Sequence, residues 1–166
     1  RYTKEMVGIR TGDVTKMESF DEFKEAVFKQ IHFLMGEAAE RVNVELIAER
    51  ELFPDVFRSA LMKDGVKTGK DMFNRRFAFE NAGLIGAVGG VNTGDALMAI
   101  KKLVYDEKKY TMTELLTALD ADWEGYEEMR NDFLEAPKYG NNIDEVDCLV
   151  AEVYENHNRA CRSYPS

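Results

Sequence analysis

Ala99 to Asn141 reads AIKKLVYDEKKYTMTELLTALDADWEGYEEMRNDFLEAPKYGNN, and this stretch is the most informative part of the chain. It predicts helix, turn, helix, turn and helix in succession, and it ends at the rigid stop PKYGN. Thr111 and Glu114 form a capping box, in which each side chain satisfies a backbone N–H at the start of a helix. No residue in the stretch is an obvious catalyst, so it indicates a fold before it indicates a chemistry.

A second capping box, Ser19 and Glu22, precedes the longest expected helix. Apolar residues then recur at steps of three and four, the pattern of a helix with one buried face. Gly36 costs this helix roughly 1 kcal/mol against alanine, so we expect a kink or close packing there. The apolar stripe comprises Phe20, Phe23, Val27, Ile31, Leu34, Ala38, Val42 and Leu46.

The expected helices occupy most of the chain. Pro54 ends the first helix and starts the second, because proline is tolerated in the first turn. Loose alternation around Phe77 and Phe79 predicts one short strand near residues 75–80, and Asn142 is expected to cap the last helix. The predicted fold class is therefore mostly α with one strand. The expected helices lie at about 19–51, 55–63, 92–106, 112–121, 126–135 and 143–159.

The composition is that of an acidic chain of domain size. Its 166 residues are 45% hydrophobic, and 22 Lys+Arg stand against 31 Asp+Glu, for a formal net charge of −9. Such a surface repels phosphate backbones, so we expect no nucleic-acid partner. No apolar run reaches the roughly 18 residues of a membrane span, and the charged start has no signal-peptide core. Two cysteines make no disulfide framework, which favours a reducing cytoplasm.

Four side chains are candidates for catalysis or metal binding. Cys148 falls opposite the apolar face of its helix, among carboxylates, whereas a reactive cysteine needs a positive setting. Cys161 has no histidine within arguable reach, so we expect both cysteines to be incidental. His32 and His157 stand alone, without other ligands at zinc spacing. We therefore predict no catalytic residue and no metal site in this chain.

Two glycine-containing segments leave alternatives open. Residues 83–90 lack the opening of a dinucleotide fingerprint, and GVKTGK at 65–70 is one residue short of a phosphate loop. Glycines allow close backbone approach, so the apolar residues of the 83–90 loop either pack in the core or line an apolar substrate. The two arginines at 75–76 either pair with local acids or bind a carboxylate bidentately.

Several segments, taken in order over about residues 11–158, resemble the glycyl radical enzymes, the family of pyruvate formate-lyase. In that family, runs like those of residues 99–109 and 136–141 lie between a catalytic cysteine loop and a glycyl radical loop. The resemblance, together with an Arg start and an unfinished last element, implies an interior fragment of a large subunit. The matching segments are SFDEF (19–23), PDVFRSAL (54–61), GKD (69–71), NTGDAL (92–97), AIKKLVYDEKK (99–109) and APKYGN (136–141).

The resemblance also implies the wider machinery. The family folds as a ten-stranded α/β barrel, in which a backbone glycine radical generates a cysteine thiyl that takes hydrogen from substrate carbon. An activating enzyme with an iron–sulfur cluster and S-adenosylmethionine installs the radical. Neither radical loop occurs in this chain, so we expect it to bind no cofactor and to be inactive alone. Expected partners are the activating enzyme and a small-molecule substrate, with accessory subunits or a homo-oligomer left open.

One departure from the family pattern indicates a substrate. Many members read GGAxYN where this chain reads RRFAFE at 75–80, followed by the unusually apolar LIGAV at 84–88. A polyol needs hydrogen-bonding walls, whereas a hydrocarbon fits an apolar lining. We therefore predict anaerobic addition of a hydrocarbon to fumarate, as in benzylsuccinate and alkylsuccinate synthases. The predicted pocket comprises Phe79, Glu80, Asn81, Leu84, Ile85 and Val88.

Two alternatives remain. Within the same family, the protein is a dehydratase or a C–N, C–S or C–C lyase, resembling glycerol dehydratase or formate acetyltransferase. Outside the family, it is a non-catalytic helical interaction domain, which folds alone and exposes no large apolar patch. An enzyme fragment instead exposes apolar surface and aggregates or stays partly molten in isolation.

Overall fold

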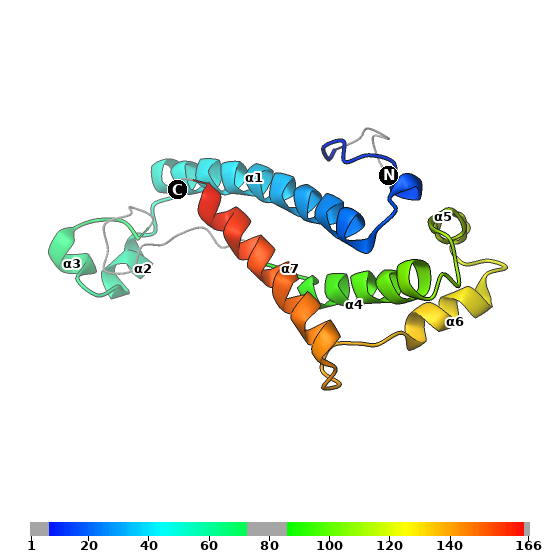
Figure 1. Cartoon of the computed structure of the whole chain (residues 1–166). Helices are drawn as coiled ribbons and strands as arrows, with labels where there is room; N and C mark the ends of the chain where they lie inside the picture. Colours follow the sequence, from blue (N-terminus) through cyan, green and yellow to red (C-terminus); the bar gives the residue numbers. More distant parts are fainter. Residues whose placement is uncertain (1–6, 73–85, 165–166) are drawn as a thin grey trace. The chain divides into compact units, whose positions relative to one another are not determined.

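The computed structural model describes residues 7–72 and 86–164, and every regular element in those ranges is helical. The strand predicted near residues 75–80 lies outside the described residues. The chain divides into a larger unit, residues 1–33 and 87–159, and a smaller unit, residues 34–86 and 160–166. Two long helices, α1 (Phe20–Leu52) and α7 (Asp144–Ser163), contribute residues to both units (Figure 1).

The larger unit has a core of inward-facing helix residues, among which Val146 is completely buried. Burying a side chain of this size contributes roughly 1.5–3 kcal/mol. Its other elements are η1 (Val14–Lys16), α4 (Gly90–Ile100), η2 (Lys101–Asp106), α5 (Met112–Asp120) and α6 (Glu127–Glu135). The core comprises Phe23, Phe28, Leu97, Met98, Met112, Leu115, Val146, Leu149, Val150 and Val153.

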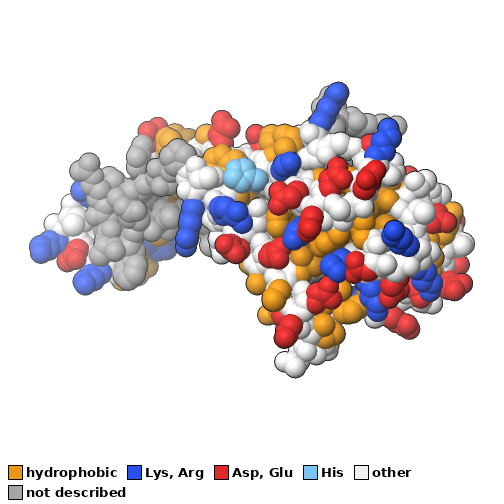
Figure 2. All heavy atoms as spheres, in the orientation of Figure 1, with side chains coloured by type: hydrophobic (Ala, Val, Ile, Leu, Met, Phe, Trp, Pro, Cys, Tyr) orange, Lys and Arg blue, Asp and Glu red, His pale blue; other side chains and the backbone are white. Residues whose placement is uncertain are grey.

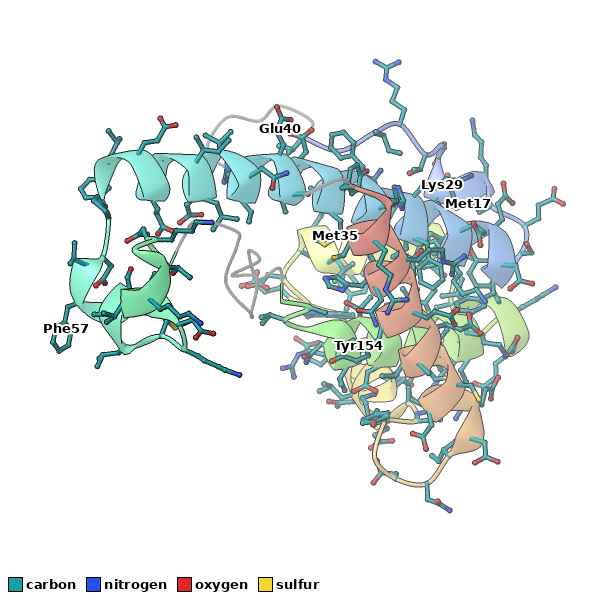
Figure 3. The ribbon with its side chains drawn as sticks, turned by 90° about the vertical axis from the view of Figure 1, so that its left-hand side faces the viewer. Met17, Lys29, Met35, Glu40, Phe57 and Tyr154 are labelled. Atoms are coloured by element: carbon teal, nitrogen blue, oxygen red, sulfur yellow. The ribbon has the colours of Figure 1, made fainter. Side chains whose placement is uncertain are left out.

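Two glycines of α4 allow a close approach to α7. A β-carbon on Gly94 would lie 2.4 Å from Val150 Cγ2, and one on Gly90 would lie 2.8 Å from the Tyr154 ring. Figure 3 labels Tyr154 on α7, beside α4. Because neither position carries a side chain, the backbone of α4 can lie directly against the side chains of α7. Gly90 closes the predicted glycine loop, and the structure makes it the first residue of α4.

The helix expected over 92–106 changes its hydrogen bonding midway. α4 ends at Ile100, and the chain continues as the π-helix η2. The Lys101 ammonium lies 2.6 Å from an Asp106 carboxylate oxygen and 2.7 Å from one of Glu145 at the start of α7. Hydrogen bonds to Asp106 and Glu145 raise the pKa of Lys101 above its ordinary value. These ion pairs fasten the π-helix to α7.

The two predicted capping boxes have different outcomes. The Thr111–Glu114 box is confirmed, since Thr111 Oγ1 accepts from Glu114 N at 3.2 Å and the Glu114 carboxylate accepts from Thr111 N at 2.7 Å. The Ser19–Glu22 box forms only in part. Ser19 Oγ accepts from Glu22 N at 3.2 Å, but the Glu22 carboxylate accepts from Glu18 N instead of Ser19 N.

The ends of the last helix also differ from expectation. Ile143, and not Asn142, precedes the first residue of α7, and its carbonyl accepts hydrogen bonds from the Val146 and Asp147 amides. Asn142 instead takes a left-handed conformation, with φ of 57°. The helix continues to Ser163, beyond the expected end near residue 159.

The smaller unit contains a short helix that the sequence analysis did not predict. α2 (Val56–Leu61) is followed by the single-turn helix α3 (Gly65–Thr68), in a range for which no helix was predicted. Asp64 and Gly69 bracket α3 with φ values of 65° and 62°. On α1, a β-carbon at Gly36 would lie 2.6 Å from Tyr164 Oη. The close packing expected at Gly36 is therefore confirmed.

The surface carries charges of both signs. Acidic and basic side chains are interspersed with apolar ones on the face shown in Figure 2. Across residues 7–72 and 86–164, no helix combines the length and the apolar character that a membrane crossing requires.

Asp132 gives the larger unit a testable pH dependence. Hydrogen bonds from Lys109 and Tyr110 hold the pKa of the Asp132 carboxyl below its usual range. A depressed pKa stabilises the fold above the unfolded-state value, about 3.9, and this contribution is lost as pH falls through the folded-state pKa. We expect the contact between residues 109–110 and α6 to loosen below about pH 4.

Hydrogen exchange of the Lys109 and Tyr110 amides, which both donate to the Leu103 carbonyl, measures this loosening once intrinsic exchange rates are removed. In Asp132→Asn the acid step disappears and protection at neutral pH decreases, because an amide forms a weaker bond with the ammonium. An identical acid step in Asp132→Asn would contradict the assignment.

Candidate functional site

Most of the predicted substrate pocket lies outside the described residues. Phe79, Glu80, Asn81, Leu84 and Ile85 fall within 73–85, so the structure does not place them. Val88 is described, and its side chain is 99% exposed. The described residues therefore build no apolar wall around Val88, and the six-residue pocket stays a prediction.

A cavity lies in the smaller unit, beside the chain that leads to residue 73. Its volume is about 360 Å³, which falls within the range of small-molecule sites. Most of its lining is apolar, and the polar side chains are those of Ser59, Lys70 and Asp71. Phe57, labelled in Figure 3, points away from the rest of α2. The lining residues are Pro54, Val56, Ser59, Ala60, Gly65, Val66, Gly69, Lys70 and Asp71.

Ser59 is the structural centre of this cavity. Its side chain is buried, and its hydroxyl donates to the Asp55 carbonyl while accepting from Met72 N at 2.8 Å. An Asp71 carboxylate oxygen also lies 3.0 Å from Ser59 Oγ. Through this hydroxyl, Ser59 joins α2 to Asp71 and Met72, which lie twelve and thirteen residues further along the chain. Sequence patterns gave no sign of this role, although Ser59 lies in the PDVFRSAL segment and Asp71 in the GKD segment.

Asp55 positions α2 for this contact. Its carboxylate accepts from Arg58 N at 2.9 Å, as an N-cap residue does, and it also accepts from Arg58 Nε. Both hydrogen bonds hold the pKa of Asp55 below its ordinary value, and the bond from the Arg58 backbone amide has the larger effect. The Ser59 hydroxyl and the Asp55 carboxylate therefore both help to fix the local fold.

The PKYGN turn is the second candidate, because side chains fix it from two directions. The Lys138 ammonium donates to the Phe133 carbonyl at 3.1 Å and to the Ala136 carbonyl at 2.8 Å, which caps the end of α6. Asp95 of α4 accepts from Tyr139 N at 2.8 Å. The Tyr139 side chain is 47% exposed, so a rigid turn presents a phenol that the larger unit does not bury. A phenol can donate or accept a hydrogen bond.

Tyr105 in η2 is the third candidate, because its hydroxyl is buried. No described residue forms a hydrogen bond with Tyr105 Oη, and its ring packs 6.1 Å from Phe20 and 6.2 Å from Phe23. Burial raises the pKa of Tyr105, and the nearby Glu22 carboxylate raises it further. π-helical turns are frequent at functional sites, but this hydroxyl stays neutral among aromatic rings. It offers no acid–base function at neutral pH.

The structure places both cysteines and both histidines on helices. Cys148 is exposed and Cys161 is half-buried, and neither is in a disulfide. His32 is exposed on α1, whereas His157 of α7 is buried. Among residues 7–72 and 86–164, no cluster of histidine, cysteine and carboxylate side chains is arranged to hold a metal ion.

Comparison with known proteins covers the whole chain. A family model described as pyruvate formate lyase-like matches residues 1–166. Trans-4-hydroxy-L-proline dehydratase from Clostridioides difficile is 37% identical over 154 residues, which cover 92% of this chain and 19% of the relative. Isethionate sulfite-lyase from Oleidesulfovibrio alaskensis is 32% identical over 155 residues, again 92% of this chain and 19% of the relative.

A solved structure matches in space as well. The B12-independent glycerol dehydratase from Clostridium butyricum, in its glycerol-bound form, superposes with a TM-score of 0.88 at 34% identity, over 99% of this chain and 21% of that chain. The chain therefore spans about a fifth of the length of these relatives. The prediction of a mostly helical part of the glycyl radical enzyme fold is confirmed. The chain belongs to the pyruvate formate lyase-like family of glycyl radical enzymes.

Proposed function

We propose that the protein containing this chain is a glycyl radical dehydratase or lyase that acts on a small polar substrate. The observation that carries the proposal is that a hydroxyproline dehydratase and a sulfite-lyase match 92% of the chain at 37% and 32% identity. The structure of the glycerol dehydratase, which superposes on the chain, also supports the proposal. This is the family alternative that the sequence analysis left open.

The predicted addition of a hydrocarbon to fumarate has no support from these relatives. That prediction relied on apolar residues at 84–88 as a pocket lining. Val88, the one predicted pocket residue that the structure describes, is 99% exposed. An apolar loop packs against protein as readily as against substrate, and sequence alone does not distinguish the two. The family match likewise gives no support to a free-standing interaction domain.

In this proposal a radical centre outside this chain takes hydrogen from substrate carbon. The chain's own proposed part is to shape and hydrogen-bond the substrate region and to exclude water from it. Among the described residues, the Tyr139 phenol on the fixed PKYGN turn suits a polyol, amino-acid or sulfonate substrate, because it supplies one oriented hydrogen bond. The expected partners are a radical-installing activating enzyme and the substrate.

The test uses the full-length protein with its activating enzyme under nitrogen. Electron paramagnetic resonance first establishes whether a glycyl radical forms. Activated protein is then offered a vicinal diol, trans-4-hydroxy-L-proline and isethionate in parallel with toluene plus fumarate, and products are identified by mass spectrometry. We expect elimination products from at least one polar substrate. A fumarate adduct with no elimination product would overturn the proposal, and failure to form any radical would overturn the whole enzymatic assignment.

Tyr139→Phe tests the phenol in that assay. Loss of one neutral hydrogen bond, worth about 0.5–1.5 kcal/mol, should lower kcat/KM roughly two- to tenfold. Radical yield should not change, because the ring and the turn remain. Tyr126→Phe, at the start of α6, is the matched control and should behave as the parent. Equal kcat/KM for parent and Tyr139→Phe would exclude a substrate contact by this hydroxyl.

A further inference from the structure

Asp95 of α4 ties the PKYGN turn to the core of the larger unit. Its carboxylate accepts from Tyr139 N at 2.8 Å, although the two residues lie 44 positions apart in the sequence. The other hydrogen bonds that the structure describes for residues 136–141 lie within residues 132–141. Those local bonds fix the shape of the turn, whereas the bond to Asp95 ties the turn to a different helix.

The helix that carries Asp95 is itself held in place. The residue before Asp95 is the buried Gly94, where a β-carbon would lie 2.4 Å from Val150 Cγ2 of α7. Two residues after Asp95, the side chain of Leu97 is 3% exposed in the core. Closely packed interiors leave few voids into which a helix could shift. Asp95 therefore gives the turn a fixed point of attachment.

The bond from α4 ends on the residue that carries the phenol. The amide and the ring of Tyr139 share one α-carbon, so a shift of the amide also moves the ring. A carboxylate acceptor forms a shorter and stronger hydrogen bond than a neutral acceptor does. Small misplacements of a group that contacts substrate lower the reaction rate strongly. The position of the phenol is therefore sensitive to a side chain on a different helix.

We propose that Asp95 is a positioning residue, which acts on the substrate through the Tyr139 phenol. The inference rests on the proposed function, because it requires that phenol to contact the substrate. Two residues that act as one unit have non-additive effects. Loss of the Asp95 carboxylate should therefore lower activity by no more than loss of the phenol does. It should have no further effect once the phenol is absent.

A double-mutant cycle in the activated full-length protein tests this coupling. Asp95→Ala should lower kcat/KM roughly two- to tenfold, with the same division between kcat and KM as Tyr139→Phe. The double variant should match Tyr139→Phe alone. Asp95→Asn keeps an oxygen acceptor, so it should restore most of the activity that Asp95→Ala loses. Asp120→Ala, at the exposed last residue of α5, is the matched control and should behave as the parent.

Hydrogen exchange of the Tyr139 amide provides a readout that needs no turnover. In the unactivated full-length protein, protection of this amide should fall roughly two- to tenfold in Asp95→Ala and persist largely in Asp95→Asn. Amides of α4 and α7 should keep their protection, because alanine favours a helix more than aspartate does. Unchanged protection of the Tyr139 amide in Asp95→Ala would overturn the proposal.

The pattern of kinetic results separates this proposal from the proposed function. A loss in Tyr139→Phe without a loss in Asp95→Ala would overturn the positioning role and leave the substrate contact in place. A loss in Asp95→Ala that persists in the Tyr139→Phe background would also overturn the positioning role alone. If neither variant changes kcat/KM, the phenol does not contact the substrate, and both the contact and the positioning role are overturned.

Discussion

Gly65→Ala is expected to open the turn between α2 and α3. The added β-carbon would lie 1.8 Å from the Ser59 carbonyl oxygen and 2.9 Å from the Ser59 carbonyl carbon. Both are backbone atoms, so no side chain can rotate away, and the chain itself has to move. Overpacking of this kind costs typically 1–3 kcal/mol and more where backbone is involved. We expect the substitution to destabilise the turn between α2 and α3 by about 3 kcal/mol, which is enough to remove most of its local order.

Hydrogen exchange of residues 59–72 in the full-length protein measures this loss. Gly65 N donates to the Met62 carbonyl at 2.9 Å and Met72 N donates to Ser59 Oγ at 2.8 Å, and both amides should lose protection. Gly69→Ala is the matched control: its β-carbon meets nothing within 4 Å, but its φ of 62° adds strain, about 1–2 kcal/mol. Equal effects of the two substitutions would contradict the predicted collision.

Gly94→Ala is expected to separate α4 from α7. Its β-carbon would lie 2.4 Å from Val150 Cγ2 and 3.1 Å from Val150 Cα. Alanine gains roughly 1 kcal/mol over glycine in helix propensity. Valine is stiff at χ1, and its Cα belongs to the opposite backbone, so the helices have to move apart. The steric cost of about 1–3 kcal/mol, together with the looser core packing around Val150, exceeds the gain.

A double-mutant cycle isolates this contact. Val150→Ala removes the γ-carbon that the new β-carbon would strike, so Gly94→Ala should be less harmful in that background than in the parent. Exchange of α4 and α7 amides provides the free energies for all four proteins. Strictly additive effects would show that the two side chains do not meet.

Local rules predicted the helices better than they predicted the connections. The Thr111–Glu114 box formed as expected because both partners lie three residues apart within one turn. Helix α3 was missed because its first residue is glycine and its flanking residues have positive φ, which are features of turns. The apolar residues of the sequence show no change of spacing at Lys101, so periodicity gave no signal for the switch to a π-helix there.

The candidate site was less predictable, for a physical reason. Ser59 acquires its role from partners twelve and thirteen residues away, and nothing in its immediate neighbours indicates them. Lys138 reads as an ordinary surface lysine, but its ammonium caps α6 through two carbonyls. The predicted pocket residues from 79 to 85 cannot be compared, because they lie outside the described ranges.

The side chains that fix the PKYGN turn have a thermodynamic consequence. Lys138 and Asp95 already hold the backbone that leads to Tyr139, and Asn141 Nδ2 adds a bond to the Lys138 carbonyl at 3.2 Å. A molecule that meets the Tyr139 ring therefore does not have to freeze a mobile loop. Ordering a single rotamer-rich side chain costs about 0.5–1.5 kcal/mol. Only this side-chain cost remains at the moment of binding, because the backbone of the turn is already ordered during folding.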